Sequence, residues 1–227
     1  MLHERIPIAK EGIPFWGIAA FFALIFAILN WQIPAGIALA GFLFIFYFFR
    51  DPERVVPQDT DHSISFVSPA DGRIVDIQQN ESLDTFNLTG CIRISIFMTV
   101  FDVHVNRSPA SGVVQRIAYS EGRFLPADRN MAMLKNEKNA ILLCMENGIQ
   151  YSIVQVAGLI ARRIVCWAEQ GDYLKKGQRI GLIRFGSRVD VYIPGACCIN
   201  IQNGQKVVAG QTVLATLIIS DTSQPNR

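Results

Sequence analysis

From Gly12 to Phe49 the chain carries no charged side chain, and a stretch of this kind leaves few ways to fold in water. It divides into two apolar blocks, Ile13 to Leu29 and Ile33 to Phe49, with the polar break Asn30-Trp31-Gln32 between them. At about 1.5 Å per residue in a helix, each block is just long enough to approach a bilayer span. Pro34 follows the break and favours the start of a second helix. The stretch therefore predicts a helical hairpin that associates with a membrane.

Basic residues flank both ends of this hairpin. Arg5 and Lys10 precede the first block, and Arg50 and Arg54 follow the second. Because positive charge prefers the cytoplasmic side, we expect both ends there, with the rest of the chain on the cytoplasmic side of the cell membrane. A cleaved signal peptide fits poorly, since the apolar region is too long. A buried helix pair in a soluble core, and shallow insertion in place of full spanning, stay open as alternatives.

The polar, proline-containing segment Asp51 to Asp59 marks a domain boundary. We expect a membrane-associated helical segment over residues 1–50 and a β-rich domain over residues 51–227, which is long enough for one compact core. One helix is expected over part of Gly158 to Ala168. Short β-prone runs lie between glycine and polar turns at Gly72 to Ile77, Cys91 to Phe97, Gly112 to Ala118, Ala140 to Met145 and Tyr151 to Val156. The predicted fold class is therefore α+β and mostly β.

Two stretches near the C-terminus share one pattern, glycine-x-x-apolar-x-x-glycine-glutamine-x-apolar. They are residues 171–180 and residues 204–213. The repeat predicts two similar β-hairpins related by a pseudo-twofold axis, as in lipoyl or biotinyl carrier domains of the barrel-sandwich type. Gly186-Ser187 stands between them, where such a carrier would present its lysine. The missing lysine argues against a swinging-arm carrier.

The dipeptide Gly186-Ser187 also has a chemistry of its own. A serine hydroxyl can attack the carbonyl of a preceding glycine, which has no side chain to block the approach and tolerates a strained backbone. The resulting ester can undergo β-elimination and hydrolysis, which leaves a pyruvoyl group at the new amino terminus. Such an attack needs a nearby base. Gly-Ser is also a common turn dipeptide, so by itself it does not separate self-cleavage from an ordinary hairpin.

His104 and Asp71 are the candidate partners of Ser187. His104 follows the apolar run Ile94 to Val100 and is the one histidine expected in the core. Asp71 lies in a Ser-Pro-Ala-Asp-Gly turn that can direct its carboxylate inward. An imidazole base, with a carboxylate to orient it, would complete a set of groups that activates the serine. Each of the two residues can equally be structural, as a core histidine or as part of an Asx turn.

The cysteines and the net charge exclude several classes of function. The five cysteines are odd in number and form no C-x-x-C pair, at Cys91, Cys144, Cys166, Cys197 and Cys198. Neither a disulfide framework nor a zinc site is indicated, and we expect no metal. A net charge of +2 is too small to argue for nucleic-acid binding, although it is compatible with a mildly basic face against anionic lipid.

Several motifs together give the chain a family resemblance. They occur in the order and approximate spacing seen in phosphatidylserine decarboxylase proenzymes, at residues 68–72 (SPADG), 101–109 (FDVHVNRSP), 122–127 (GRFLPA) and 185–187 (FGS). The hydrophobic N-terminal region, followed by an Arg-Asp-Pro segment, resembles the short, membrane-associated subfamily. The match covers nearly the whole chain and is far more specific than any single motif.

The resemblance implies self-cleavage between Gly186 and Ser187, into a β subunit of residues 1–186 and an α subunit of residues 187–227 that stay associated. Ser187 would become the cofactor, a covalent pyruvoyl group, and the family's Asp/His/Ser processing triad falls on Asp71, His104 and Ser187. The implied reaction converts phosphatidylserine to phosphatidylethanolamine and releases CO₂, with the pyruvoyl group as electron sink. Larger family members carry a second histidine three residues after the first. Arg107 stands there, so His104 can serve both processing and turnover.

The implied partners are a phospholipid substrate and the membrane, and a homo-oligomer stays open. Arg107, Arg162 and Arg163 are candidate contacts for the lipid phosphate or substrate carboxylate, and Phe124 for the acyl chains. Each of these residues can also be structural. Archaetidylserine is an alternative substrate, because the motifs are silent on the lipid backbone. A non-enzymatic, membrane-anchored carrier-like adaptor is the rival from another class, disfavoured because only a short hairpin separates the two glycine repeats.

Overall fold

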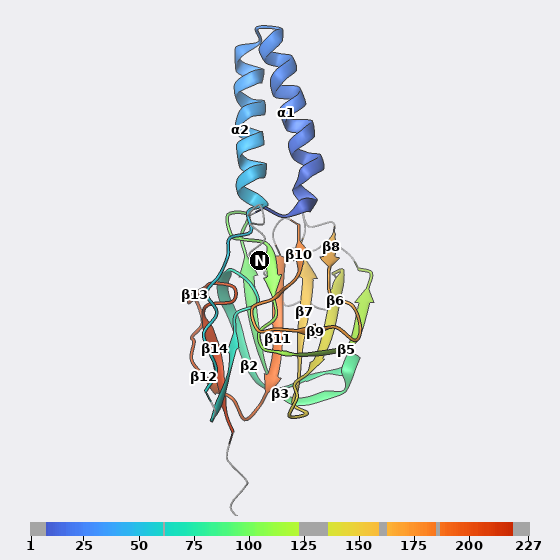
Figure 1. Ribbon diagram of the computed structural model, residues 1–227, viewed down its shortest axis with the longest axis vertical. Coiled ribbons are helices and arrows are strands. Elements are labelled where there is room, and N and C mark those ends of the chain that lie inside the picture. Colours follow the sequence, from blue (N-terminus) through green and yellow to red (C-terminus); the bar gives the residue numbers. More distant parts are fainter. Residues whose placement is uncertain (1–7, 61, 123–135, 159–162, 185–186, 220–227) are drawn as a thin grey trace, which may run out of the picture. The chain divides into compact units, whose positions relative to one another are not determined.

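The computed structural model describes residues 8–60, 62–122, 136–158, 163–184 and 187–219 (Figure 1). The chain divides into two compact units, Met1–Glu53 and Arg54–Arg227. The first unit is helical and the second is built from β-strands. The α+β, mostly β fold class predicted from the sequence is confirmed.

The first unit is the expected helical hairpin. After a short 3₁₀ turn η1 (Lys10–Gly12), helix α1 runs over Ile13–Ile28 and helix α2 over Gln32–Phe48. Asn30 adopts a positive φ of 56° in the connection, a conformation that asparagine tolerates better than most residues. Lys10–Ile28 is long and apolar enough to cross a membrane, whereas Gln32–Phe48 is shorter. Most of their large apolar side chains are exposed, which does not fit a helix pair buried in a soluble core.

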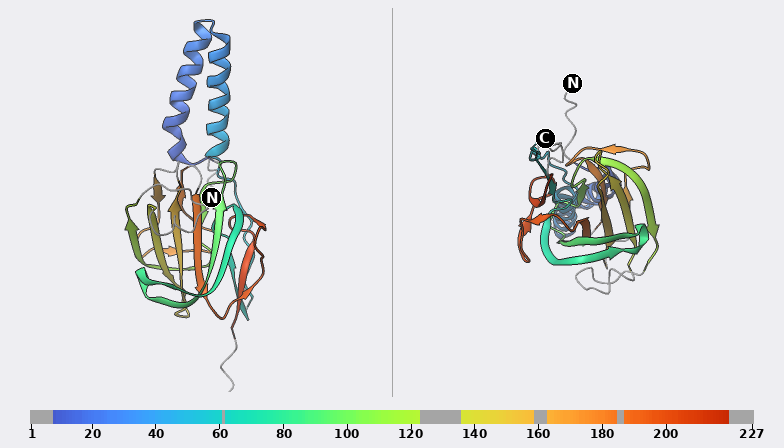
Figure 2. Two further views of the ribbon diagram at one scale, coloured as in Figure 1. Left: turned by 180° about the vertical axis from the view of Figure 1, so that it is seen from behind. Right: turned by 90° about the horizontal axis from the view of Figure 1, so that it is seen from below.

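The second unit contains one large antiparallel sheet and two small ones. The large sheet has the order β13-β2-β3-β11-β7-β6-β5-β9, and the small sheets have the orders β1-β14-β12 and β4-β10-β8. Figure 2 shows the large sheet curling around an interior. The strands are β1 (Ser63–Val67), β2 (Gly72–Leu83), β3 (Leu88–Met98), β4 (Val105–Arg107), β5 (Gly112–Ser120), β6 (Lys138–Cys144), β7 (Gln150–Ala157), β8 (Ile164–Cys166), β9 (Tyr173–Leu174), β10 (Arg179–Ile183), β11 (Ser187–Pro194), β12 (Cys198–Ile199), β13 (Lys206–Val207) and β14 (Val213–Ile218). A short 3₁₀ turn η2 (Asp84–Phe86) joins β2 to β3.

The large sheet consists of two halves with equivalent arrangements of strands, β13-β2-β3-β11 from one edge and β9-β5-β6-β7 from the other. The edge strand β13 pairs with β2 at Gly72, and the opposite edge strand β9 pairs with β5 at Gly112. β3 and β6 come next, and β11 and β7 meet in the middle. The two small sheets correspond in the same way, with β1-β14 matching β4-β10. The two similar halves predicted from the glycine repeats are therefore present, and the correspondence extends over most of the β unit. The predicted hairpins are wrong, however, because the two strands of each repeat lie in different sheets: β9 pairs with β5 and β10 with β4, while β13 pairs with β2 and β14 with β1.

The centre of this pseudo-symmetry is a second repeat, Ser-Pro-Ala-Asp-Gly at residues 68–72 and Ser-Pro-Ala-Ser-Gly at residues 108–112. The two turns exchange main-chain hydrogen bonds, from Val67 N to Pro109 O at 2.9 Å and from Arg107 N to Pro69 O at 2.8 Å. Each turn also binds one glycine repeat. Gly210 N donates to the Ser68 carbonyl and Gly177 N to the Ser108 carbonyl, both at 2.8 Å. The four motifs thus form one interlocked unit.

The five β-prone runs predicted from the sequence lie in β2, β3, β5, β6 and β7, although Met145 falls just beyond β6. The helix expected over part of Gly158 to Ala168 is wrong for its described part. Residues 164–166 form the strand β8, which pairs with Gly181, Leu182 and Ile183 of β10. Ile164 and Val165 are β-branched, and the open edge of β10 offers hydrogen bonds that override a weak helical pattern.

Candidate active site

Ser187 is the first residue of β11 and lies in the middle of the large sheet. Its cross-strand neighbours are Met98 on β3 and Ala157 on β7. The residue is fully buried, and its Oγ has no hydrogen-bond partner among the described residues. Leaving a buried hydroxyl without a partner costs free energy, so it needs an explanation beyond packing. Gly186, the other half of the predicted cleavage site, lies outside the described residues.

The position of Ser187 is fixed by the strand that it begins. β11 pairs with β3 along its whole length and with β7 over residues 187–192. The next residue, Arg188, donates from Nε to Asp190 Oδ1 at 2.7 Å and from Nη2 to Ser95 Oγ at 2.7 Å. Because side chains alternate along a strand, this buried ion pair lies on the face opposite Ser187. The hydroxyl therefore starts from a rigid strand, as a positioned nucleophile requires.

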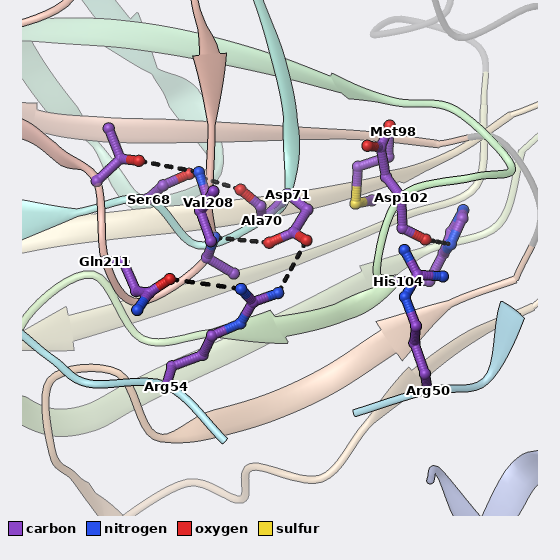
Figure 3. Close-up of polar contacts among 12 residues, drawn as sticks. Arg50, Arg54, Ser68, Ala70, Asp71, Met98, Asp102, His104, Val208 and Gln211 are labelled. Carbon is purple, nitrogen blue, oxygen red and sulfur yellow. Dashed lines mark hydrogen bonds and ion pairs between the residues drawn. The ribbon is translucent and has the colours of Figure 1, made fainter. Parts of the chain in front are cut away.

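His104 lies between β3 and β4 and is 3% exposed. Its Nδ1 is 3.0 Å from the carbonyl oxygen of Asp102 (Figure 3). A carbonyl oxygen can only accept a hydrogen bond, so Nδ1 carries the proton, and Nε2 is the basic nitrogen of the neutral ring. Ile183 N donates to the His104 carbonyl at 3.3 Å, which ties the histidine to the strand that leads toward residue 187.

The carbonyl that orients His104 belongs to a tight turn over Thr99 to Asp102. Asp102 Oδ2 accepts hydrogen bonds from the Thr99 main-chain nitrogen and from Thr99 Oγ1, both at 2.8 Å. Asp102 N donates back to the Thr99 carbonyl at 3.1 Å. Asp102 is not one of the site residues predicted from the sequence. An aspartate two residues before the histidine, after a threonine, is a recognisable turn signal that could have suggested one.

Asp71 makes different contacts from the ones expected of a triad carboxylate. Its Oδ1 accepts from Ala209 N at 2.8 Å and its Oδ2 accepts from Arg54 Nη2 at 3.0 Å (Figure 3). Ser111 occupies the same place in the pseudo-symmetric turn, where its Oγ accepts from Lys176 N at 3.0 Å. Capping this loop amide is therefore a structural task, which serine performs in the other copy. Capping requires only an acceptor oxygen. The negative charge of Asp71, which pairs with Arg54, is therefore not needed for capping.

The structure brings the predicted segments together through their main chains. The strand β4, next to His104, pairs with β10 through Val105 and Leu182. Asn106 of β4 contacts Met98, the residue directly across from Ser187. The histidine segment and the start of β11 therefore meet around Met98. Asp71 is held by Arg54 and Ala209, and its part in orienting the imidazole stays a prediction.

The predicted substrate arginines have unequal surroundings. Arg107 is 5% exposed, and its Nη1 donates to the Gly177 carbonyl at 3.0 Å, where it braces the first glycine repeat. Its Cδ also lies close to Gly210, so this side chain reaches both repeats. Arg163 is exposed, and its carbonyl accepts from Arg184 N at 3.3 Å. Arg162 and Phe124 lie outside the described residues. No group of three or more metal-binding side chains occurs in the part of the chain that the structure describes.

Comparison with known proteins identifies the class to which this fold and site belong. The family model of phosphatidylserine decarboxylase matches residues 42–215. A phosphatidylserine decarboxylase proenzyme from Desulfotalea psychrophila is 47% identical over 96% of this chain and 100% of its own length. Proenzymes of the same name from Oleidesulfovibrio alaskensis and Geotalea uraniireducens are 48% and 44% identical, over 92% and 96% of this chain and 93% and 100% of their own lengths.

The matched proteins are enzymes, and their names describe them as proenzymes. The chain belongs to the phosphatidylserine decarboxylase family. The family resemblance found in the sequence motifs is confirmed. The alternative of a non-enzymatic carrier-like adaptor is set aside, because the likeness extends over nearly the whole chain, and shared glycine repeats alone could not produce it.

Proposed function

We propose that this chain is a proenzyme that cleaves its own backbone between Gly186 and Ser187 and then decarboxylates phosphatidylserine to phosphatidylethanolamine. The observation that carries the proposal is the Ser187 hydroxyl, which is fully buried at the start of a central strand without a hydrogen-bond partner among the described residues. In a family whose members are named proenzymes, a hydroxyl so placed is suited to attack the peptide bond that precedes it.

Processing requires a proton acceptor near the hydroxyl, and His104 is the candidate. Its Nδ1 proton is committed to the Asp102 carbonyl, which leaves Nε2 as the basic nitrogen. Asp71 adds a negative charge paired with Arg54. The attack and the following β-elimination would leave dehydroalanine at residue 187, which water would convert to a pyruvoyl group with release of ammonia. Met98 and Ala157 provide apolar neighbours on both sides of this residue.

The two products of such a cut would remain one folded unit. The segment after the cut contributes β11, β12, β13 and β14. β11 lies between β3 and β7 of the preceding segment, β13 pairs with β2, and β14 pairs with β1. Separating the two pieces would expose the core and break a central strand ladder. An α subunit of residues 187–227 and a β subunit of residues 1–186 therefore stay associated.

In turnover, a pyruvoyl group at residue 187 would supply an electrophilic carbonyl for the substrate amine and an electron sink for the pair released with CO₂. The chain's own residues position and protonate. Once it has taken up a proton, His104 Nε2 is suited to deliver it to the substrate carbon that loses the carboxylate. Arg163 is an exposed candidate for the lipid phosphate, whereas Arg107 already braces the glycine repeat at Gly177.

We further propose that the helical hairpin holds the enzyme at the cell membrane, with the β unit on the cytoplasmic side. The support is the apolar helix Lys10–Ile28 together with the basic residues at both ends of the hairpin. Removing this hairpin should leave the protein unable to sediment with vesicles. A phospholipid substrate makes such an anchor useful, because it keeps the site close to the lipid surface.

Intact mass spectrometry of the purified protein and of a Ser187→Ala variant, under denaturing conditions, tests the proposal. We expect the wild-type chain to give two fragments that meet at Gly186 and Ser187, the smaller one lighter by one ammonia than a serine-initiated peptide. The variant should stay a single chain. Released CO₂ is then measured with phosphatidylserine and, separately, with archaetidylserine in mixed micelles. An uncut wild-type chain with no CO₂ release would overturn the proposed function.

A further inference from the structure

Three buried amide side chains form a directed row inside the β unit. Asn139 Nδ2 donates to Gln155 Oε1 at 3.0 Å, and Gln155 Nε2 donates to Asn106 Oδ1 at 2.9 Å. Asn106 Nδ2 then donates to Met98 Sδ at 3.8 Å. Asn139 is 3% exposed, and Gln155 and Asn106 are fully buried. The row crosses three strands and ends at a sulfur atom.

The thioether at the end determines which way the row points. Sulfur in methionine can accept a hydrogen bond but cannot donate one, so the Asn106 atom that faces Met98 must be the NH₂ group. Its oxygen must then face Gln155, and the oxygen of Gln155 must face Asn139. Reversing the three amides would set the Asn106 oxygen against the sulfur, two acceptors in contact. The sequence of donors is therefore fixed by chemistry as well as by distance.

The row ends beside the reacting residue. Met98 lies directly across the ladder from Ser187, and directly opposed residues project to the same face of a sheet. Gln155 stands two residues before Ala157, the other neighbour of Ser187, so it shares that face as well. Asn106 thus presents a fully buried N–H donor toward the side of the sheet occupied by the Ser187 hydroxyl.

Among the residues that the structure describes, the acceptor that faces this donor is a poor one. A thioether is a weak acceptor, and a buried N–H group that is only weakly bonded carries much of the desolvation penalty of an unmade hydrogen bond. If Asn106 served only for packing, a leucine of similar size would do so without a poorly bonded donor. The orientation of Asn106 instead matches the requirement of a reaction in which negative charge develops on a nearby oxygen.

We propose that Asn106 Nδ2 donates to the carbonyl oxygen of the peptide bond preceding Ser187 while that oxygen carries negative charge, and that Gln155 and Asn139 are positioning residues for it. The inference rests on the proposed function. Ser187 Oγ passes its proton to the base and bonds to the carbonyl carbon, and the carbonyl electron pair moves onto oxygen. When the pair returns, the bond from carbon to the Ser187 nitrogen breaks, and that nitrogen takes up the proton.

The test is the rate of self-cleavage of freshly refolded Asn106→Leu, followed by intact mass. Leucine keeps the size and removes the donor, so we expect cleavage to slow by about 100- to 1,000-fold, as for loss of one oxyanion donor. Hydroxylamine supplies a second readout, because it cuts the ester that forms when the acyl group moves to Ser187 Oγ. It can also cut Asn-Gly peptide bonds, here Asn147-Gly148 and Asn203-Gly204, and intact mass distinguishes those fragments from the cut before Ser187. The Asn106→Leu chain should resist the hydroxylamine cut before Ser187, since the ester does not form.

Two further variants separate chemistry from folding. Gln155→Met removes the group that orients Asn106 but leaves the donor, so it should slow cleavage less, about tenfold, and it carries the test if Asn106→Leu does not fold. Ser152→Ala removes a buried hydrogen bond to the Ile141 carbonyl on the opposite face of the same strand and should cleave at the wild-type rate. Near-ultraviolet circular dichroism of each substitution in a Ser187→Ala chain checks that the core is packed.

The outcomes distinguish this inference from the proposed function. If the wild-type chain does not cleave, the proposed function fails. If the wild-type chain cleaves and folded Asn106→Leu cleaves equally fast, the donor role is wrong and the proposed function stands. A folded Asn106→Leu chain that stays uncut in buffer but is cut by hydroxylamine at the wild-type rate would also overturn the inference, because its block would then follow ester formation.

Discussion

Replacing Asp71 separates its two contacts, because the fold contains a natural serine at the equivalent place. Asp71→Ser copies Ser111 and should keep the hydrogen bond to Ala209 N, while Asp71→Ala loses it. A buried hydrogen bond to a charged group contributes about 1.5–3 kcal/mol, and a partly exposed ion pair such as the one with Arg54 at most about 1 kcal/mol. Asp71→Ala should therefore reduce the free energy of unfolding by about 2–4 kcal/mol, and Asp71→Ser by about 1 kcal/mol or less.

These values are measured by thermal unfolding of the full chain in detergent, with Ser187→Ala added so that every sample is uncut. At about 2–4 °C per kcal/mol for a domain of this size, the two melting temperatures should differ by roughly 5 °C. Self-cleavage is then compared without the Ser187 substitution. We expect Asp71→Ser to fold but to cleave slowly, because a hydroxyl cannot supply the negative charge. Ser111→Ala is the matched control, with the cap on Lys176 N lost and cleavage retained.

Either of two results would refute this reasoning. Equal melting temperatures for Asp71→Ser and Asp71→Ala would show that the hydrogen bond to Ala209 N does not contribute the capping energy assigned to it. Cleavage of Asp71→Ser at the wild-type rate would show that the carboxylate acts as a cap alone. Asp71 would then leave the set of processing residues, and the Ser187 hydroxyl would depend on His104 and its Asp102 carbonyl.

Two further predictions concern buried groups that take no part in the proposed cleavage chemistry. Burial, together with the neighbouring Cys198 and Cys91 thiols, raises the pKa of Cys197 to about 12, so at pH 8 only about 10⁻⁴ of it is thiolate. Iodoacetamide should therefore label the exposed Cys198 first in the folded chain, and labelling of Cys197 should rise steeply as the pH increases. Tandem mass spectrometry measures the order of labelling, and faster labelling of Cys197 would contradict this prediction. In the uncut Ser187→Ala chain, Asp190→Leu should reduce stability to urea by about 3–5 kcal/mol, because it leaves the Arg188 charge buried. Arg188→Met combined with Asp190→Leu should cost far less than the sum of the single changes, and additive losses would contradict the buried ion pair.

The sequence predicted the elements whose signals are local. The uncharged run with one polar break predicted the bounds of α1 and α2 within a residue or two. Two long apolar blocks around a short polar break leave only one place for the turn between two helices. The glycine repeats predicted the turns at Gly177 and Gly210, which both need the positive φ that glycine adopts without strain. They did not predict that the strands on either side of each turn pair with other strands and do not form a hairpin. Strand β8 was missed because its pairing with β10 is a tertiary contact that no local pattern shows.

The candidate site was harder to predict, because its contacts join residues far apart in the chain. Nothing near Asp71 in the sequence indicates that its carboxylate binds Ala209 N, 138 residues away. The group that orients His104 is a main-chain carbonyl, which has no signature of its own in a sequence. The amide row from Asn139 to Asn106 depends on the pairing of separate strands. One signal in the sequence does point to this frame, the second Ser-Pro-Ala repeat at residues 108–112.

That repeat explains where chemistry can reside in a fold of two similar halves. Positions that do the same structural work in both copies are accounted for by folding, as with the Ser68 and Ser108 carbonyls that bind Gly210 and Gly177. Positions that differ are the ones that folding leaves unexplained. Asp71 replaces a serine that caps equally well, and β11 begins with a buried hydroxyl that no described residue hydrogen-bonds. Because the pseudo-symmetric frame holds both positions rigidly, such departures from symmetry can specialise for processing without loss of the fold, and Asp71→Ser tests whether this one has.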